Sequence, residues 1–337
     1  DHRNVASIYN NMAALYQKTE KFADALEHYR LALSIEKKEL AAGGRSDDPI
    51  NEEDEESEGD SPTQKLLHHR VTHDDVAQTH VHLAMIHFSM NNESEAMHAY
   101  QAAADTYLMA PKETAMEGDP SLNAELATVY FQMADLLQTK DDSEGALEFL
   151  EKSLKIQQKV LGSYHLDVAH TYNMIADVHF SNGDVEPCIA NFQSAREIYE
   201  LTGEAESADM AHLLSNLALA HEEVGNEQEA LSLYEDALAV RMKLDEQVSS
   251  KLSPTHPEVK TRKLAIADIY GHMGMLLDEA GEQDDAMEMY EKALDLRKRY
   301  RMSKDDDAAV ADILHNICIV KYIMEYEYRD PSLFSTF

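Results

Sequence analysis

One spaced pattern of small and aromatic residues recurs along this chain of 337 residues. A small residue is followed twelve positions later by Ala, then four positions on by an aromatic residue, then three on by another Ala. Because a fixed recurring pattern reflects a repeated structural unit, it constrains the fold more than any other feature. The six copies, in which Leu150, Ser153 and Cys188 depart from the pattern, are Ala13, Ala25, Tyr29, Ala32; Ala84, Ala96, Tyr100, Ala103; Ala134, Ala146, Leu150, Ser153; Ala176, Cys188, Phe192, Ala195; Ala218, Ala230, Tyr234, Ala237; and Gly274, Ala286, Tyr290, Ala293.

This spacing is that of two antiparallel helices joined by a tight turn. The first small residue and the Ala twelve positions on face each other where the helix axes come closest. The aromatic residue lies one turn further on the same face of the second helix and fills the gap. A hairpin this narrow cannot bury its apolar stripe alone, so neighbouring hairpins must stack. We therefore predict an all-α solenoid of six helix pairs.

The distances between copies define the organisation of the chain. Successive first small residues are 71, 50, 42, 42 and 56 residues apart, so the basal period is 42 and the excess marks three insertions after second helices. We therefore divide the chain into repeat 1 (1–40), an acidic insertion expected to be disordered (41–70), repeat 2 (71–110), an insertion (111–120), repeat 3 (121–161), repeat 4 (162–203), repeat 5 (204–246), an insertion (247–260), repeat 6 (261–302), a capping helix (303–328) and a tail (329–337).

Turn and end signals agree with this division. Gly183, Gly225 and Gly281 stand between paired helices, where a left-handed residue commonly ends a helix. The last segment reads as one more first-type helix, with Cys318 in the small position and no second helix after it.

The pattern resembles tetratricopeptide repeats. Its 42-residue period is longer than the usual 34 and is similar to the kinesin-light-chain variant, as is the stretch from Val160 to Glu200 with its loop, His165 and Val168-Ala169. The resemblance implies a right-handed superhelix whose first helices line a concave groove that holds a peptide.

In that family, Asn residues in the middle of first helices often clamp a peptide backbone, because one amide can both donate and accept. The alternative is that these residues cap loops or bridge neighbouring helices. The positions that match, or that hold another polar residue there, are Asn10, Asn11, His82, Gln132, Asn173, Asn216, His272 and Asn316.

The other positions expected to face the groove are mostly acidic. Only Lys18 opposes them, so we expect a basic or apolar peptide rather than an acidic one. These acidic positions are Asp135, Asp177, Glu222, Asp268, Asp278 and Asp312.

Composition excludes several classes of partner. With 64 acidic against 29 basic residues, the formal net charge is −35, which repels nucleic acid and anionic membrane surfaces. Part of this charge lies in the stretch from Arg45 to Pro62. It reads either as a solvated loop or as a segment that mimics nucleic acid, shields the groove or binds a basic partner. Two cysteines form no disulfide framework, and a reducing compartment, the cytoplasm, fits best; an organelle is the alternative if a transit peptide precedes Asp1.

The sequence contains no constellation that indicates chemistry. We find no phosphate-binding Gly-rich loop, nucleophile elbow or triad, and we expect no cofactor. His69 and His73 have helical i, i+4 spacing, but no third ligand completes a metal site, so we expect no metal.

Three functions remain open at this point. The first is a scaffold or adaptor that binds a peptide or subunit in the groove. The second is a structural subunit of a larger assembly, and the third is the regulatory region of a longer motor or enzyme chain.

Overall fold

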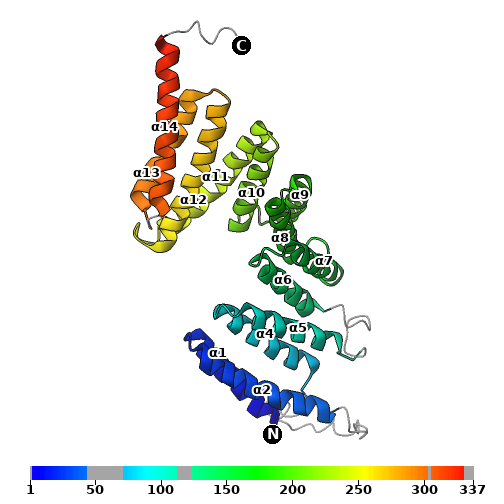
Figure 1. The fold of residues 1–337 in the computed structure, drawn as a ribbon. Coiled ribbons are helices and arrows are strands. Elements are labelled where there is room, and N and C mark those ends of the chain that lie inside the picture. Colours follow the sequence, from blue (N-terminus) through cyan, green and yellow to red (C-terminus); the bar gives the residue numbers. More distant parts are fainter. Residues whose placement is uncertain (1, 44–70, 112–122, 303–304, 330–337) are drawn as a thin grey trace. The chain divides into compact units, whose positions relative to one another are not determined.

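The computed structural model describes residues 2–43, 71–111, 123–302 and 305–329 (Figure 1). All regular elements in these ranges are α-helices. None of the described helices is long and apolar enough to cross a membrane. In chain order they are α1 (His2–Lys18), α2 (Phe22–Gly43), α4 (His73–Ser89), α5 (Glu93–Leu108), α6 (Ala124–Gln138), α7 (Ser143–Val160), α8 (Leu166–Asn182), α9 (Val185–Thr202), α10 (Ala208–Glu223), α11 (Glu227–Ser249), α12 (Pro257–Glu279), α13 (Gln283–Tyr300) and α14 (Asp305–Arg329).

The chain forms two compact units, Asp1–Thr171 and Tyr172–Phe337, whose boundary falls within α8. In the first unit, α1 packs on α2, α2 on α4, α4 on α5, α5 on α6 and α6 on α7. In the second, α9 packs on α10, and packing continues in chain order to α14. Sequential antiparallel pairs with a final capping helix confirm the predicted all-α tetratricopeptide-like fold.

The expected close-packing positions are buried. The small residues from Ala13 to Gly274 and the aromatic residues facing them are almost completely shielded from solvent. Ser153 occupies an Ala position because its hydroxyl donates to the carbonyl of Ala127 at 2.8 Å. Three buried clusters each join a helix pair to the next first helix, as in the cluster of α12, α13 and α14 around Tyr290. The core is therefore distributed along each unit, as stacked hairpins require.

Six turns inside the repeats have the same backbone geometry. In each, the residue seven positions after the first small residue has a positive φ: Glu20, Asn91, Asp141, Gly183, Gly225 and Gly281. The next residue donates its N–H to the carbonyl five positions earlier, for example Asn226 to His221 at 2.9 Å. This is the hydrogen bond of a Schellman motif, which satisfies a free carbonyl at a helix end. The expectation for the three glycines is confirmed, and three non-glycine residues adopt the same conformation.

The segments expected as insertions differ from one another. The 14-residue excess before repeat 6 mainly lengthens two helices, because α11 continues to Ser249 and α12 begins at Pro257. His256 caps α12, and Pro257 stands in its first turn, where a missing N–H costs nothing. The first insertion begins later than expected, since α2 reaches Gly43. Most of the segments 41–70 and 111–120, including the acidic stretch and His69, lies outside the described residues.

The final helix packs on α13 through Ile313, Ile317 and Val320. Cys318, which we placed in the small position, is exposed. The small position of a first helix faces its own second helix, and α14 has none among the described residues.

Candidate functional site

Eight of the predicted site residues fall into two sets that differ by one position. Six stand two positions before the first small residue of their repeat, and we call them the amide row: Asn11, His82, Gln132, Asn216, His272 and Asn316. Asn10 and Asn173 stand three positions before it, and we call them the inner pair. This single step along a helix decides what each side chain contacts.

The inner pair joins helices within the structure. Asn10 Nδ2 donates to Glu36 Oε1 at 2.8 Å and to Thr79 Oγ1 at 3.2 Å, linking α1 to α2 and α4. Asn173 Nδ2 donates to the Tyr199 hydroxyl at 3.4 Å. The Oδ1 atom of each is buried and has no hydrogen-bond partner among the described residues. Both side chains thus have the bridging geometry that the sequence left as an alternative.

In four of its members, the amide row contacts the aromatic residue of the preceding repeat. The His82 ring stacks on Tyr29 with centroids 5.2 Å apart, and burial lowers the pKa of this histidine. Gln132 Oε1 accepts a hydrogen bond from the Tyr100 hydroxyl at 3.4 Å. Tyr290, whose pKa burial raises to about 12, receives a hydrogen bond from Asn316 that opposes this rise.

His272 belongs to the most developed of these contacts. Its ring stacks on Tyr234 with centroids 5.4 Å apart. Glu222 Oε2 accepts from the Tyr234 hydroxyl at 2.7 Å and lies 3.6 Å from His272 Nδ1. Burial raises the pKa of Glu222, but the nearby His272 and the hydrogen bond from Tyr234 outweigh it, so the net pKa is lowered. A charged carboxylate is therefore held between two repeats.

Asn216 differs because the preceding repeat carries Phe192, which has no hydroxyl. Its Nδ2 donates instead to Asp177 Oδ1 at 3.0 Å and lies 3.2 Å from His212 Nδ1. Burial raises the pKa of Asp177, while His212 and the bond from Asn216 oppose the rise. The amide nitrogen of Asn216 thus contacts groups inside the protein, so a ligand would meet its Oδ1.

The remaining predicted residues are more open. Asn11 is exposed on α1. Asp135 is half-buried, and burial raises its pKa. Its charge also contributes to the raised pKa of Tyr100, so these two groups lie within electrostatic reach.

Arginines from second helices, which the sequence reasoning did not include, alter the charge of this face. Arg297 on α13 forms an ion pair with Asp268 on α12. The charge of Asp268 also supports protonation of the half-buried Arg241 on α11, against the effects of burial and Arg262. The charge of Asp268 is thus offset by arginine. Their shared spacing could have identified these arginines from the sequence, since Arg241 and Arg297 both stand eleven residues after the Ala of their second helix.

The arrangement offers hydrogen-bond acceptors, donors and carboxylates held in fixed positions. Within the described residues, no three His, Cys, Asp or Glu side chains gather so that they could hold a metal ion.

Known families match the chain in four places. One model described as tetratricopeptide repeat matches residues 125–187 and 167–243, and a second of the same description matches residues 5–41 and 266–300. Together they cover more than half of the chain. No curated protein sequence matches.

Several solved structures share the fold. BtubC (BKLC) from P. vanneervenii has a TM-score of 0.55 at 19% identity, covering 67% of this chain and 81% of that one. The C-terminal part of a TPR repeat-containing protein from Cytophaga hutchinsonii has a TM-score of 0.53 at 13% identity, covering 90% and 87%. Kinesin light chain TPR-like repeats from Podosopora anserina have a TM-score of 0.51 at 19% identity, covering 68% and 99%. At these identities the likeness concerns the fold alone.

Proposed function

Since this chain belongs to the tetratricopeptide repeat family, whose members are generally non-catalytic protein-interaction scaffolds, we propose that it binds a peptide segment of a partner protein across its first helices. We assign the binding to the second unit, with Asn216, His272 and Asn316 of the amide row as its contacts. Two free cysteines fit a reducing compartment such as the cytoplasm.

The observation that carries this proposal is the fixed polar row of α10, α12 and α14. Each member is held by a neighbouring repeat, through Asp177, Tyr234 or Tyr290, and is only partly buried. Groups fixed in this way lose little conformational entropy on binding, which favours affinity. Such a row suits an extended peptide backbone, because its N–H and C=O groups recur at regular intervals.

The charge of this row indicates the chemistry of the peptide. Asp177 and Glu222 flank Asn216 and His272, and Asp278 and Asp312 add carboxylates on α12 and α14. A basic or apolar segment therefore fits better than an acidic one.

The test is peptide binding to the whole chain with single-residue variants. A Lys/Arg-rich peptide pool is expected to bind, and Asn216→Ala or Asn316→Ala to weaken binding about fivefold or more. Asn191→Ala on the second helix α9, where the amide donates to the carbonyl of Pro187 in the same helix, is the matched control and is expected to bind normally. Equal binding by all three variants, or competition by an Asp/Glu-rich pool at the amide row, would reject the proposal.

A structural subunit of a larger assembly is a second candidate, favoured by one apolar stripe. On α1, Ile8 is 56% and Leu15 65% exposed, and Val5 and Met12 continue the same helix face. Exposed apolar stripes of this kind often mark interfaces. Sedimentation of the isolated chain tests it: association that Ile8→Glu abolishes supports the assembly role, and a monomer at all concentrations removes its support.

A further inference from the structure

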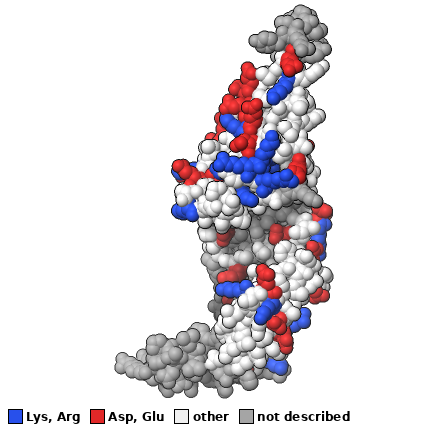
Figure 2. All heavy atoms as spheres, turned by 90° about the vertical axis from the view of Figure 1, so that its left-hand side faces the viewer, with Lys and Arg blue, Asp and Glu red and all other residues white. Residues whose placement is uncertain are grey.

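Basic side chains gather at one end of the α12–α13 pair in the described part of this acidic chain. Two short runs supply it, Lys260–Lys263 at the start of α12 and Arg297–Arg301 at the end of α13. The helices are antiparallel, so both runs lie at the same end; Thr261 Oγ1 is 3.8 Å from Met302 Sδ. Figure 2 shows Lys and Arg side chains gathered in one cluster on its visible face, whereas elsewhere on that face the two signs of charge are mixed.

Some of these charges are paired and others are available. Arg297 pairs with Asp268, Arg301 with Asp307, and Lys263 with Asp245. Arg262 forms only an exposed i, i+4 pair with Glu258. Among the described residues no carboxylate forms an ion pair with a group we call the basic rim, namely Lys260, Lys298 and Arg299. Lys298 and Arg299 are both exposed.

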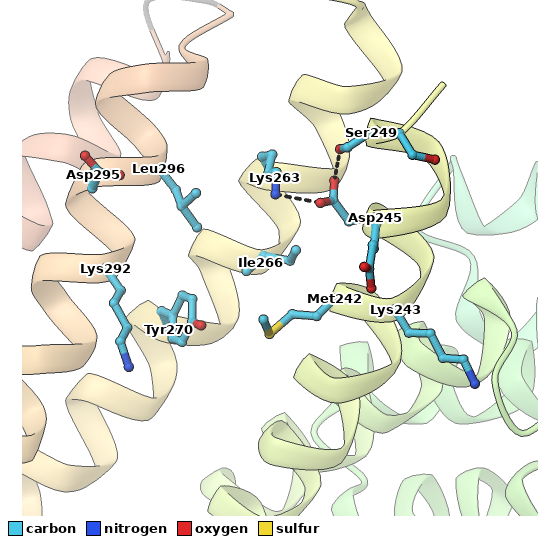
Figure 3. A pocket seen from close by; sticks show the side chains of 12 residues that line it. Met242, Lys243, Asp245, Ser249, Lys263, Ile266, Tyr270, Lys292, Asp295 and Leu296 are labelled. Carbon is cyan, nitrogen blue, oxygen red and sulfur yellow. Dashed lines mark hydrogen bonds and ion pairs between the residues drawn. The ribbon is translucent and has the colours of Figure 1, made fainter. Parts of the chain in front are cut away.

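A hollow of about 880 Å³ adjoins the basic rim. It lies between α11, α12 and α13, where Ile266 and Tyr270 of α12 stand between Met242 of α11 and Leu296 of α13 (Figure 3). Met242 is 51% exposed, so the hollow offers apolar surface to a ligand. No residue of the amide row lines it.

The extended end of α11, which continues to Ser249, supplies part of the lining of the hollow. Asp245, in the extension of α11, is only 4% exposed and lies 2.5 Å from Lys263 Nζ and 3.0 Å from Ser249 Oγ (Figure 3). This paired, hydrogen-bonded carboxylate holds the extended end of α11 against α12. The part of the wall formed by α11 is therefore held in a fixed position beside α12.

Helical periodicity connects the hollow to the basic rim. On α12, Lys260 lies one turn before Lys263, and on α13, Arg299 lies one turn after Asp295 and Leu296. Charges of both signs line the hollow, namely Glu246 and Asp295 with Lys243 and Lys292. The cations of the rim attract the carboxylates of a ligand, and the apolar surface of the hollow attracts an apolar side chain.

We propose that the basic rim and the adjoining hollow form a second interaction surface, which binds an acidic segment of a partner protein that carries an apolar side chain. This surface is separate from the amide row. It prefers a ligand of the opposite charge, acidic rather than basic. A phosphate polyanion fits it less well, because it has no apolar side chain to contact Met242, Ile266 and Leu296 in the hollow.

Fluorescence anisotropy with the whole chain tests this surface. The probe is a labelled peptide of glutamates with one central leucine, and a second peptide has serine in its place. Lys298→Glu/Arg299→Glu is expected to weaken binding of the leucine peptide about tenfold or more. Lys37→Glu/Lys38→Glu on α2, an exposed pair with the same charge change, is the control and is expected to change binding less than about twofold.

Further measurements make the result decisive. Lys298→Gln/Arg299→Gln guards against loss of folding in the reversed variant, and thermal melts of all variants are compared. The serine peptide is expected to bind more weakly than the leucine peptide. Equal losses in both charge-reversed variants, no loss in either, or tighter binding of a single-stranded oligonucleotide would overturn the proposal. An Asn216→Ala variant that still binds the acidic peptide separates this surface from the amide row.

Discussion

At the scale of single residues, one carboxylate lies in an energetically unfavourable buried position. Glu36 is 3% exposed, accepts from Asn10, and leaves its Oε2 without a hydrogen-bond partner among the described residues. Burial raises its pKa, while Thr79 and Asn10 oppose the rise. A charge in this place lowers the stability of the fold at neutral pH.

Replacing the charge with an amide is therefore expected to stabilise the protein. Glu36→Gln should raise the free energy of unfolding at pH 7 by about 1–2 kcal/mol, because it removes a buried charge and supplies N–H donors. A raised folded-state pKa means that the wild-type carboxyl contributes stability at low pH and loses it as pH rises through that pKa. The advantage of the variant should therefore shrink as pH falls from 7 towards 4. Urea unfolding measures it, with exposed Glu27→Gln as control; a constant difference at all pH values contradicts the explanation.

Two glycines of α12 offer a matched pair for close packing. A Cβ atom on Gly274 would lie 2.7 Å from the Tyr290 ring, whereas one on Gly271 would meet nothing within 4 Å. Gly271→Ala should stabilise the protein by about 0.5–1 kcal/mol through helix propensity. Gly274→Ala should destabilise it by about 1–2 kcal/mol, because overpacking outweighs the same gain. Thermal melts of the two variants measure these stability changes. Equal changes in the two variants would contradict the predicted clash between a Cβ atom at position 274 and Tyr290.

At the scale of elements, the shared turn makes a prediction for the first repeat. Glu20 has a φ of 57°, in the conformation that Gly183, Gly225 and Gly281 adopt in the later repeats. A side chain there costs about 1 kcal/mol relative to glycine. Glu20→Gly should therefore stabilise the first unit by about 0.5–1 kcal/mol, whereas Gly225→Ala should destabilise the second by a similar amount. Urea unfolding of both variants measures this, and Glu20→Ala controls for loss of the charge.

The elements could be predicted more fully than the site. Small residues at Ala13 and Ala25 place two helices because close approach tolerates few alternatives. The identity of a site residue depends on one position along a helix, so Asn10 and Asn11 could not be distinguished until the helix faces were known. Nor could the sequence show that the residues before repeat 6 lengthen α11 and α12. The spacing between repeats gives the number of inserted residues but not whether they form helix or loop. The pairing of Asp268 with Arg297 could not be predicted either, because it depends on how α12 and α13 pack against each other.

At the scale of the whole molecule, the net charge dominates. With 64 acidic and 29 basic residues, like charges repel throughout the folded chain. Repulsion of this kind destabilises the compact state, and salt screens it. The screening length falls from about 30 Å at 0.01 M to about 8 Å at 0.15 M ionic strength.

We therefore expect the urea midpoint of unfolding to rise as NaCl is added over this range. KCl should act equally if the effect is screening rather than the binding of one ion. A midpoint that falls with salt would show that favourable ion pairs, such as Arg297 with Asp268, outweigh the repulsion.

The identical turns also bear on how such a chain can change in length. Gly183 and Gly225 stand 42 residues apart, and each ends a first helix with the same left-handed residue and the same hydrogen bond. A genetic deletion of residues 184–225 would join Gly183 to Asn226 and rebuild an equivalent turn, with helix direction and alternation preserved. Loss or duplication of whole repeats by recombination at these points would thus leave each remaining hairpin closed. An engineer could shorten or extend the array at the same places.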